Sequence, residues 1–312
     1  MSNTPTHTPY DGSATPFTIG LRQLDLATWL EVDRHYEAYL AQKHALVGRD
    51  RDAVFRAEPD TLAAQAEVFG LVRDHLIGGF PSIFPGTRQW EAALAALDRV
   101  GSEDHPPLLA ASLLVQEDLV LMRRGADGWR LAAASLCFPS SWSLAEKFGR
   151  PLDEIHGPVP GFGAGSRPAE LIARMFDNLR PDRPVERMNW SLQTDAELHK
   201  PMSSRQRDAR AAARPVRFGE TPADHAFIRV ERQTLRKLPV SGDVLFTIRI
   251  FVDPMAVLAR HPQRATLARS FATQLAAMEA DQLDYKGLSA DHDRLIDALE
   301  AMSRDGVHPF DP

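Results

Sequence analysis

Two strand-like runs joined by a short turn constrain the fold of this chain more than any other feature. Residues 227–238 read FIRVERQTLRKL and residues 244–252 read VLFTIRIFV, with PVSGD between them. Runs rich in β-branched and aromatic residues are typical of strands. A five-residue connection that contains glycine is the right length for a hairpin. The pattern therefore predicts two neighbouring antiparallel strands.

A second hairpin is predicted earlier in the chain. Residues 108–124 and 129–138 are apolar runs that flank the turn GADG, and residues 188–193 read MNWSLQ, a further short strand. A helix capped by Ser166 lies between the hairpins. Strands joined by hairpins, with helices gathered in one insertion, predict an α+β fold with an antiparallel sheet and not a doubly wound parallel one.

The rest of the chain predicts helices on either side of this sheet. We expect a disordered tail at 1–20, a helical N-terminal extension at 21–107, a sheet-containing core at 108–255 and C-terminal helices at 256–312, all in one structural unit. One extension helix is expected at Trp90 to Val100. The helix N-caps that we predict outside the core are Asp25, Asp60 and Ser289.

Composition excludes several classes of protein. The net charge of −6 argues against nucleic acid or an anionic membrane as the main partner. The sequence has no apolar run of about 18 residues that would span a bilayer, and its polar, proline-rich start does not read as a signal peptide. The single cysteine excludes an iron–sulfur cluster with cysteine ligands from this chain alone, and fits the cytoplasm, which we predict.

One histidine stands at a position that suits a ligand. Ser143 and Glu146 have the spacing of a capping box, which predicts a helix of about two turns. A further turn must end at His156, because Pro158 disfavours helical geometry at the residue before it and has no N–H to donate. An imidazole at such a stop points into whatever the segment covers.

Charged residues inside the later strands allow two interpretations. Side chains alternate between the faces of a strand, so Arg229 and Glu231 share one face, and Arg249 interrupts an otherwise apolar run. A buried arginine must pair or meet solvent. One interpretation is structural: an ion pair of Glu231 with Arg249 or Arg229, or a sheet face in contact with solvent. The other is a pocket in which a carboxylate holds a cationic substrate.

Three long motifs resemble a known family. The runs LCFPSSWSLAEKFGRPLDEIHGPVPGF, RMNWSL and FIRVERQTLRKLPVSGDVLFTIRIF are similar to the haem-dependent oxidative N-demethylase-like family, and the resemblance extends from Arg22 to Leu283. It implies a PAS-like antiparallel sheet that is enlarged at both ends and holds one b-type haem. The implied activity is oxidative N-demethylation of a small secondary amine such as dimethylamine, with O₂.

The resemblance also implies partners. Electrons from NADPH would arrive through partner subunits that carry FMN and a [2Fe–2S] cluster, with tetrahydrofolate as a further cofactor of the complex. The competing hypothesis is a non-enzymatic haem-PAS sensor of gas or redox state, or a PAS protein that has lost the haem. A sensor usually needs an output domain, and the sequence contains none that we recognise.

The resemblance assigns roles to residues of the shared motifs. His156 is the candidate proximal ligand of the haem iron, and a capping or core histidine is the alternative explanation of that residue. Cys137 is the rival that would supply a thiolate, and His75, which lies outside the shared motifs, is a lesser candidate. The other residues expected beside the cofactor are Pro158, Phe162 and Trp190, the last of which is equally well explained as core packing. The residues assigned as one set to the distal, catalytic pocket are Asn189, Arg229, Glu231 and Arg249.

Overall fold

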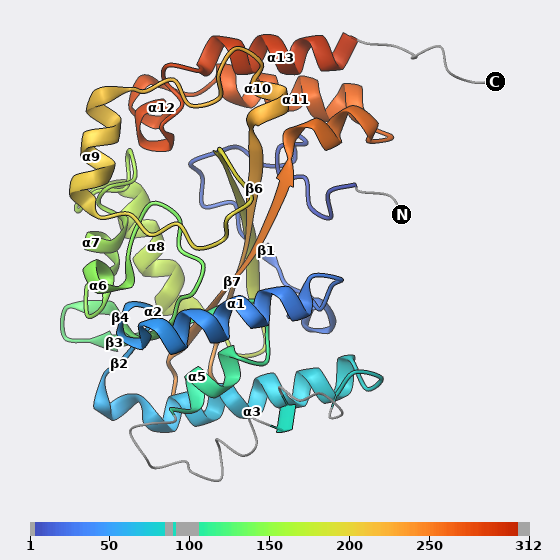
Figure 1. The fold of residues 1–312 in the computed structure, drawn as a ribbon. Helices are drawn as coiled ribbons and strands as arrows, with labels where there is room; N and C mark the ends of the chain where they lie inside the picture. Colours follow the sequence, from blue (N-terminus) through green and yellow to red (C-terminus); the bar gives the residue numbers. More distant parts are fainter. Residues whose placement is uncertain (1–3, 85–89, 92–105, 305–312) are drawn as a thin grey trace.

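A seven-stranded antiparallel sheet forms the centre of the molecule. The computed structural model describes residues 4–84, 90–91 and 106–304 (Figure 1). Neighbouring strands follow the order β1-β5-β6-β7-β3-β4-β2, and each pair is antiparallel. The strands are β1 Arg22–Gln23, β2 Phe55–Ala57, β3 Asp118–Gly125, β4 Gly128–Ser135, β5 Val185–Gln193, β6 Phe227–Lys237 and β7 Val244–Pro254.

Both predicted hairpins are confirmed. Strands β6 and β7 pair along their whole length, from Phe227 opposite Pro254 to Lys237 opposite Val244. Gly128, which begins β4 directly after the turn, has φ +97°, a value that residues with a Cβ rarely adopt. The helices and the antiparallel sheet together confirm the α+β class, and the PAS-like topology stays a prediction.

The register decides which side chains share a face of the sheet. Glu231 lies opposite Asn189 of β5 and Ile250 of β7, so these three side chains point to the same side, which we call the Glu231 face. Arg232 lies opposite Met188 and Arg249, which places Arg249 on the other side. The β6–β7 pairing therefore separates Arg249 from Glu231.

Helices surround the sheet at both ends and along one side (Figure 1). Helices α10 to α13 lie at one end of the long strands, α3 and α5 lie at the other end, and α6 to α9 flank one side. The described α-helices are α1 Tyr36–Arg49, α2 Arg51–Val54, α3 Leu62–Gly79, α5 Pro107–Ser112, α6 Leu144–Lys147, α7 Leu152–His156, α8 Arg167–Asn178, α9 Ser204–Ala213, α10 Pro222–His225, α11 Arg264–Ala276, α12 Ala280–Lys286 and α13 His292–Arg304. Within these described ranges, no helix is both long and apolar enough to cross a bilayer.

The strand predicted to begin at residue 108 begins later. Residues 107–112 form α5 instead, and the strand starts at Asp118. Leucine and alanine favour a helix, and Pro107 is suited to its first turn. Every residue of α5 is buried, so an apolar run alone could not distinguish a buried helix from a buried strand.

Helix starts were predicted less well than helix positions. Ser166 caps α8 as expected, with Oγ accepting the N–H of Ala169. Asp25 caps only a short 3-10 helix, Leu26–Thr28, and Asp60 lies inside another, Pro59–Thr61, so neither is the N-cap of a long helix. Ser289 hydrogen-bonds Asp284 and lies before α13 without capping it. The predicted helix at Trp90 falls mostly outside the described residues.

The N-terminal segment is packed and is not a free tail over its described part. Tyr10 is 1% exposed and stacks on Phe271 of α11, with ring centroids 4.6 Å apart. His7 Nε2 lies 3.0 Å from the Glu31 carboxylate. An aromatic ring buried in this way contributes apolar contact that a polar, proline-rich composition does not reveal, which is why residues 4–20 were wrongly expected to be disordered.

Candidate functional site

The turn that carries His156 is shorter than predicted. Helix α6 has only four residues, and the Ser143 side chain makes no capping hydrogen bond to it. The Glu146 carboxylate instead accepts the backbone N–H of Ser204, at the start of α9. The predicted capping box is therefore wrong, because its carboxylate connects two helices. His156 ends α7 as expected.

The ring of His156 is fixed by one hydrogen bond. Its Nδ1 lies 2.9 Å from the carbonyl oxygen of Leu152. A carbonyl only accepts, so Nδ1 carries the hydrogen and Nε2 keeps its lone pair. Burial, with a smaller effect of the Lys147 charge, lowers the pKa of His156 to about 4. The imidazole is therefore neutral at neutral pH and has a free nitrogen, the arrangement found in histidines that bind metals.

Positive charge collects around this histidine. Burial is the largest cause that lowers the pKa of Lys147 to about 8, and the charge of Arg207 lowers it further. Burial likewise lowers the pKa of Lys286 to about 8 and that of Arg187. The charge of Glu231 opposes the shift in all three cations. The single negative charge of Glu231 therefore acts on three cations. Because positive charge exceeds negative charge here, the region attracts anions.

Glu231 is held in place by two neighbours on its own strand. Gln233 Nε2 donates to its carboxylate over 3.0 Å, and Arg229 Nε lies 3.5 Å from the other oxygen. Asn189 is directly opposite on β5. Tyr285 of α12 feels the same carboxylate: burial and then the charge of Glu231 raise the pKa of its hydroxyl. The carboxylate therefore has a fixed orientation among polar groups from three elements.

The structure does not bring the predicted distal set together. Asn189, Arg229 and Glu231 share the Glu231 face, whereas Arg249 lies on the opposite face, 2.7 Å from the carboxylate of Asp33. Arg229 is fully buried, and its two terminal nitrogens donate to the carbonyls of Leu198 and Phe138. Of the two structural ion pairs considered, Glu231 with Arg229 is present.

Trp190 lies in the core that joins the sheet to the C-terminal helices. Its Nε1 donates to Gln274 over 2.8 Å, and its ring meets Phe271 edge-on. It points to the face opposite Glu231, since it pairs with Val230 in the register. Its position is that of packing, the second of the two explanations considered. Phe162 is buried in the hydrophobic core, and Pro158 is exposed.

The rival ligands are differently placed. His75 Nε2 is 3.4 Å from the backbone nitrogen of Leu30, and its ring meets Trp29 edge-on. Cys137 is fully buried, and burial, with a smaller effect of the Asp118 charge, raises the pKa of its thiol to about 12. Its sulfur lies within the hydrophobic core, so an iron could reach it only if core side chains were displaced.

Sequence reasoning missed four residues of this region. Arg187 and Lys147 stand inside shared motifs, and Arg187 is two residues from Asn189, so strand alternation could have placed it on the same face. Tyr285 and Lys286 come from α12, almost one hundred residues later than β5. Nothing in the local pattern of α12 indicates that it meets the sheet, so only the tertiary structure reveals these two.

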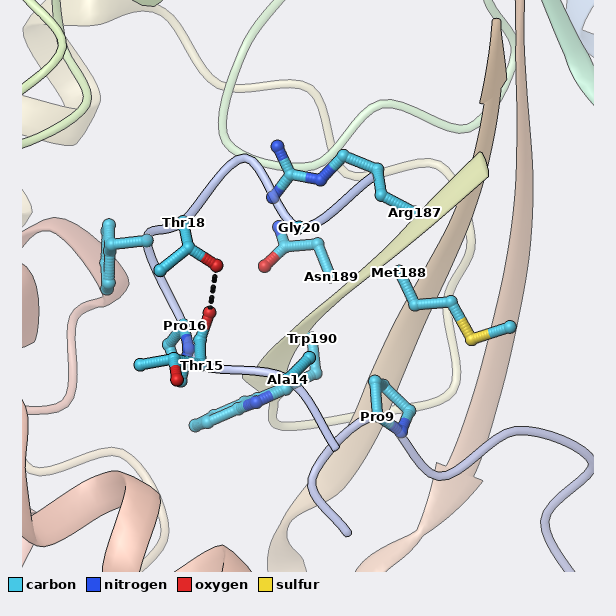
Figure 2. A pocket seen from close by; sticks show the side chains of 11 residues that line it. Pro9, Ala14, Thr15, Pro16, Thr18, Gly20, Arg187, Met188, Asn189 and Trp190 are labelled. Carbon is cyan, nitrogen blue, oxygen red and sulfur yellow. Dashed lines mark hydrogen bonds between the residues drawn. The ribbon is translucent and has the colours of Figure 1, made fainter. Parts of the chain in front are cut away.

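A small pocket opens beside β5 where residues 9–20 run along it (Figure 2). Arg187 and Asn189 point to one side of the strand and Met188 points to the other, as strand alternation requires. Thr18 lies on the same side as the two polar groups, and its hydroxyl donates to Thr15. The pocket is too small for a large planar cofactor, but it leaves space beside the guanidinium.

Comparison with known families supports the resemblance noted from the motifs. Residues 20–296 match the family described as haem-dependent oxidative N-demethylase, alpha subunit-like. Across the described residues, no group of three or more His, Cys, Asp or Glu side chains is arranged to hold a metal ion. A haem iron needs only one axial ligand from the protein, because the porphyrin supplies four nitrogens. The match covers most of the chain, which therefore belongs to the haem-dependent oxidative N-demethylase, alpha subunit-like family.

Proposed function

We propose that this chain binds one b-type haem through Nε2 of His156 and removes an N-methyl group from a small secondary amine. The family suggests the haem dependence and the reaction class. The observation that carries the assignment to His156 is the hydrogen bond from its Nδ1 to the carbonyl oxygen of Leu152. This bond leaves Nε2 unprotonated, with a lone pair that can bind iron. His75 Nε2 already accepts the N–H of Leu30, and Cys137 is enclosed by the hydrophobic core, so neither presents an available lone pair of this kind.

The surroundings of His156 fit a haem in two further respects. Ile155 and Val159, which flank the histidine, are partly buried against the hydrophobic core and suit an apolar macrocycle. Lys147 and Arg187 supply positive charge near the imidazole, as two propionate carboxylates require. The chain would therefore contribute one axial nitrogen, an apolar contact surface and compensating cations.

The chain's own polar groups would bind and orient the substrate. When bound, haem supplies the one-electron and O₂ chemistry. Glu231 would hold the ammonium form of the amine by an ion pair, or accept its proton. Gln233 and Arg229 fix this carboxylate, so Arg229 has a positioning role. Asn189 adds an amide on the same face, while Arg249 and Trp190 are left out of the proposal because they face the other way.

We further propose that electrons come from partner subunits. The family description names an alpha subunit, which favours a complex of several subunits. FMN, a [2Fe–2S] cluster and tetrahydrofolate would then belong to the partners, with NADPH as the source of electrons. The cytoplasmic location likewise stays a prediction.

Absorption spectroscopy of the purified chain tests the haem assignment. Titration with haem should give a Soret band that saturates at one haem per chain, and His156→Ala should abolish or shift this band. His75→Ala is the matched control and should leave the spectrum unchanged. An unaltered spectrum in His156→Ala would remove His156 as the ligand. A wild-type chain that takes up no haem would contradict the proposed function and favour a PAS protein without haem.

A further inference from the structure

Arg187 is a largely buried arginine whose guanidinium lacks a partner. Its Nε is buried without a hydrogen bond, as are the Nε atoms of four other arginines in the described ranges. Those four have other contacts: Arg210, Arg229 and Arg249 donate through their terminal nitrogens, and Arg236 stacks on Trp29. Within the described part of the chain, the side chain of Arg187 makes no hydrogen bond and no ion pair.

The carboxylate whose charge acts on Arg187 is already engaged. Glu231 attracts Arg187 electrostatically, but its carboxylate is hydrogen-bonded by Gln233 and lies 3.5 Å from Arg229. A further cation, Lys286, lies in the same field, because Arg187 adds to the effect of burial that lowers the pKa of Lys286. Arg187 also adds, after burial and Lys147, to the lowering of the pKa of the neutral His156. Arg187 therefore contributes to an uncompensated excess of positive charge beside the histidine.

An unpartnered guanidinium is unfavourable in the free protein and useful to a ligand. A buried charge without a partner is destabilising, and such groups concentrate at functional sites. The planar fork of arginine matches the two oxygens of a carboxylate. Arg187 lies at the edge of the pocket beside β5, on the same side as Asn189 (Figure 2), so a carboxylate has space to reach it.

We propose that Arg187 receives one propionate carboxylate of the haem. This inference rests on the proposed function, since it names the residue that fixes the orientation of the cofactor held by His156. Both ligands that could bind Arg187 do so through a carboxylate. One is a haem propionate, as proposed here, and the other is a small free carboxylate.

A porphyrin without carboxylates distinguishes these sources. Wild-type protein and Arg187→Met are titrated with haem and with haem dimethyl ester, in which both propionates are blocked. The wild type should prefer haem to the ester. In Arg187→Met that preference should fall by roughly ten- to a hundred-fold, the amount expected for one charge-assisted pair, while affinity for the ester stays unchanged. Arg187→Lys should keep part of the preference, because it retains the charge and loses the fork.

Two controls separate ligand binding from a structural role. Arg183→Met removes an exposed arginine just before β5 and should leave the preference unaltered. Without haem, Arg187→Met should melt at the same temperature as the wild type or higher, because an unpaired buried charge is lost, whereas a structural arginine would lower the melting temperature. An undiminished preference for haem in Arg187→Met overturns this inference alone. Failure of the wild type to bind either porphyrin overturns the proposed function with it.

Discussion

Glu231 is the residue on which the proposed recognition of an amine depends. Glu231→Gln keeps the shape of the side chain and removes its charge, so the ammonium loses its counter-charge. We expect dimethylamine to bind roughly ten- to a hundred-fold more weakly, the effect of losing about 1.5–3 kcal/mol from a hydrogen bond to a charged group. The measurement is the shift of the Soret band during titration with dimethylamine, after haem saturation.

Two comparisons make this prediction specific. Haem stoichiometry should be the same in Glu231→Gln and wild type, because the ligand is His156. Glu170→Gln alters an exposed carboxylate on α8 and should leave the titration unchanged. Equal affinity for the amine in Glu231→Gln and wild type would show that this carboxylate does not hold the substrate.

The buried thiol of Cys137 should make the free energy of unfolding fall at alkaline pH. Its thiol has an ordinary pKa near 9, and the fold raises that pKa to about 12. Between these values the unfolded chain has lost the proton and the folded chain keeps it, so the contribution to stability is full below pH 9 and is lost as pH rises toward 12. Denaturant unfolding from pH 8 to 11 should show a steeper loss of stability in wild type than in Cys137→Ala. Parallel pH profiles of the two proteins would contradict this account.

Helices α6 and α8 are both preceded by a serine that suits an N-cap, but they differ in whether that serine makes the capping hydrogen bond. Ser166 and Ser143 both precede a helix, but only Ser166 accepts a backbone N–H. We expect Ser166→Ala to lower the free energy of unfolding by about 1 kcal/mol, the usual effect of losing an N-cap. Ser143→Ala serves as the matched control and should change it by less than roughly 0.5 kcal/mol, as most surface substitutions do. Equal losses in chemical denaturation would refute the distinction.

The strands could be predicted from sequence, and their register could not. Alternation along β6 predicts that Arg229 and Glu231 share a face, and this is confirmed. Whether Arg249 joins them depends on how β7 pairs with β6, and a shift of one residue moves every side chain of β7 to the other face. The sequence predicts a connection of five residues, whereas six residues, 238–243, lie between the strands, and an error of one residue at a strand end is enough to leave that shift open. The observed pairing of Arg249 with Arg232 therefore divided a set of residues that sequence reasoning treated as one.

The sequence predicts those parts of the candidate site whose residues are close together in the chain. It does not predict the parts that the tertiary fold brings together from distant segments. The turn that ends at His156 follows from prolines close by in the chain, so its position was predicted correctly. The orientation of the ring depends on the Leu152 carbonyl, four residues earlier, and appears only when the turn is built. Lys286 reaches the region from α12 by donating to the carbonyl of Trp190, a contact between segments far apart in sequence.

At the scale of the whole molecule, strand β7 connects two hydrophobic clusters. Ile250 belongs to the larger cluster, which includes α1, α3 and the β3–β4 hairpin, and Phe251 belongs to the cluster beneath α11 and α13. Neighbouring residues of one strand point to opposite faces, so neither cluster can lose its share of β7 without disturbing the other. This arrangement favours the single structural unit that the sequence suggested.

Cooperative unfolding follows from this shared strand. Leu121→Ala removes a fully buried side chain from the larger cluster and Phe271→Ala one from the smaller. We expect losses of about 2–5 and about 3–5 kcal/mol respectively, each seen as a shift of one calorimetric transition. Val240→Ala, at a position 88% exposed in the β6–β7 turn, should not shift it. If the clusters were independent, each core variant would instead split the melt into two transitions, with only one of them displaced.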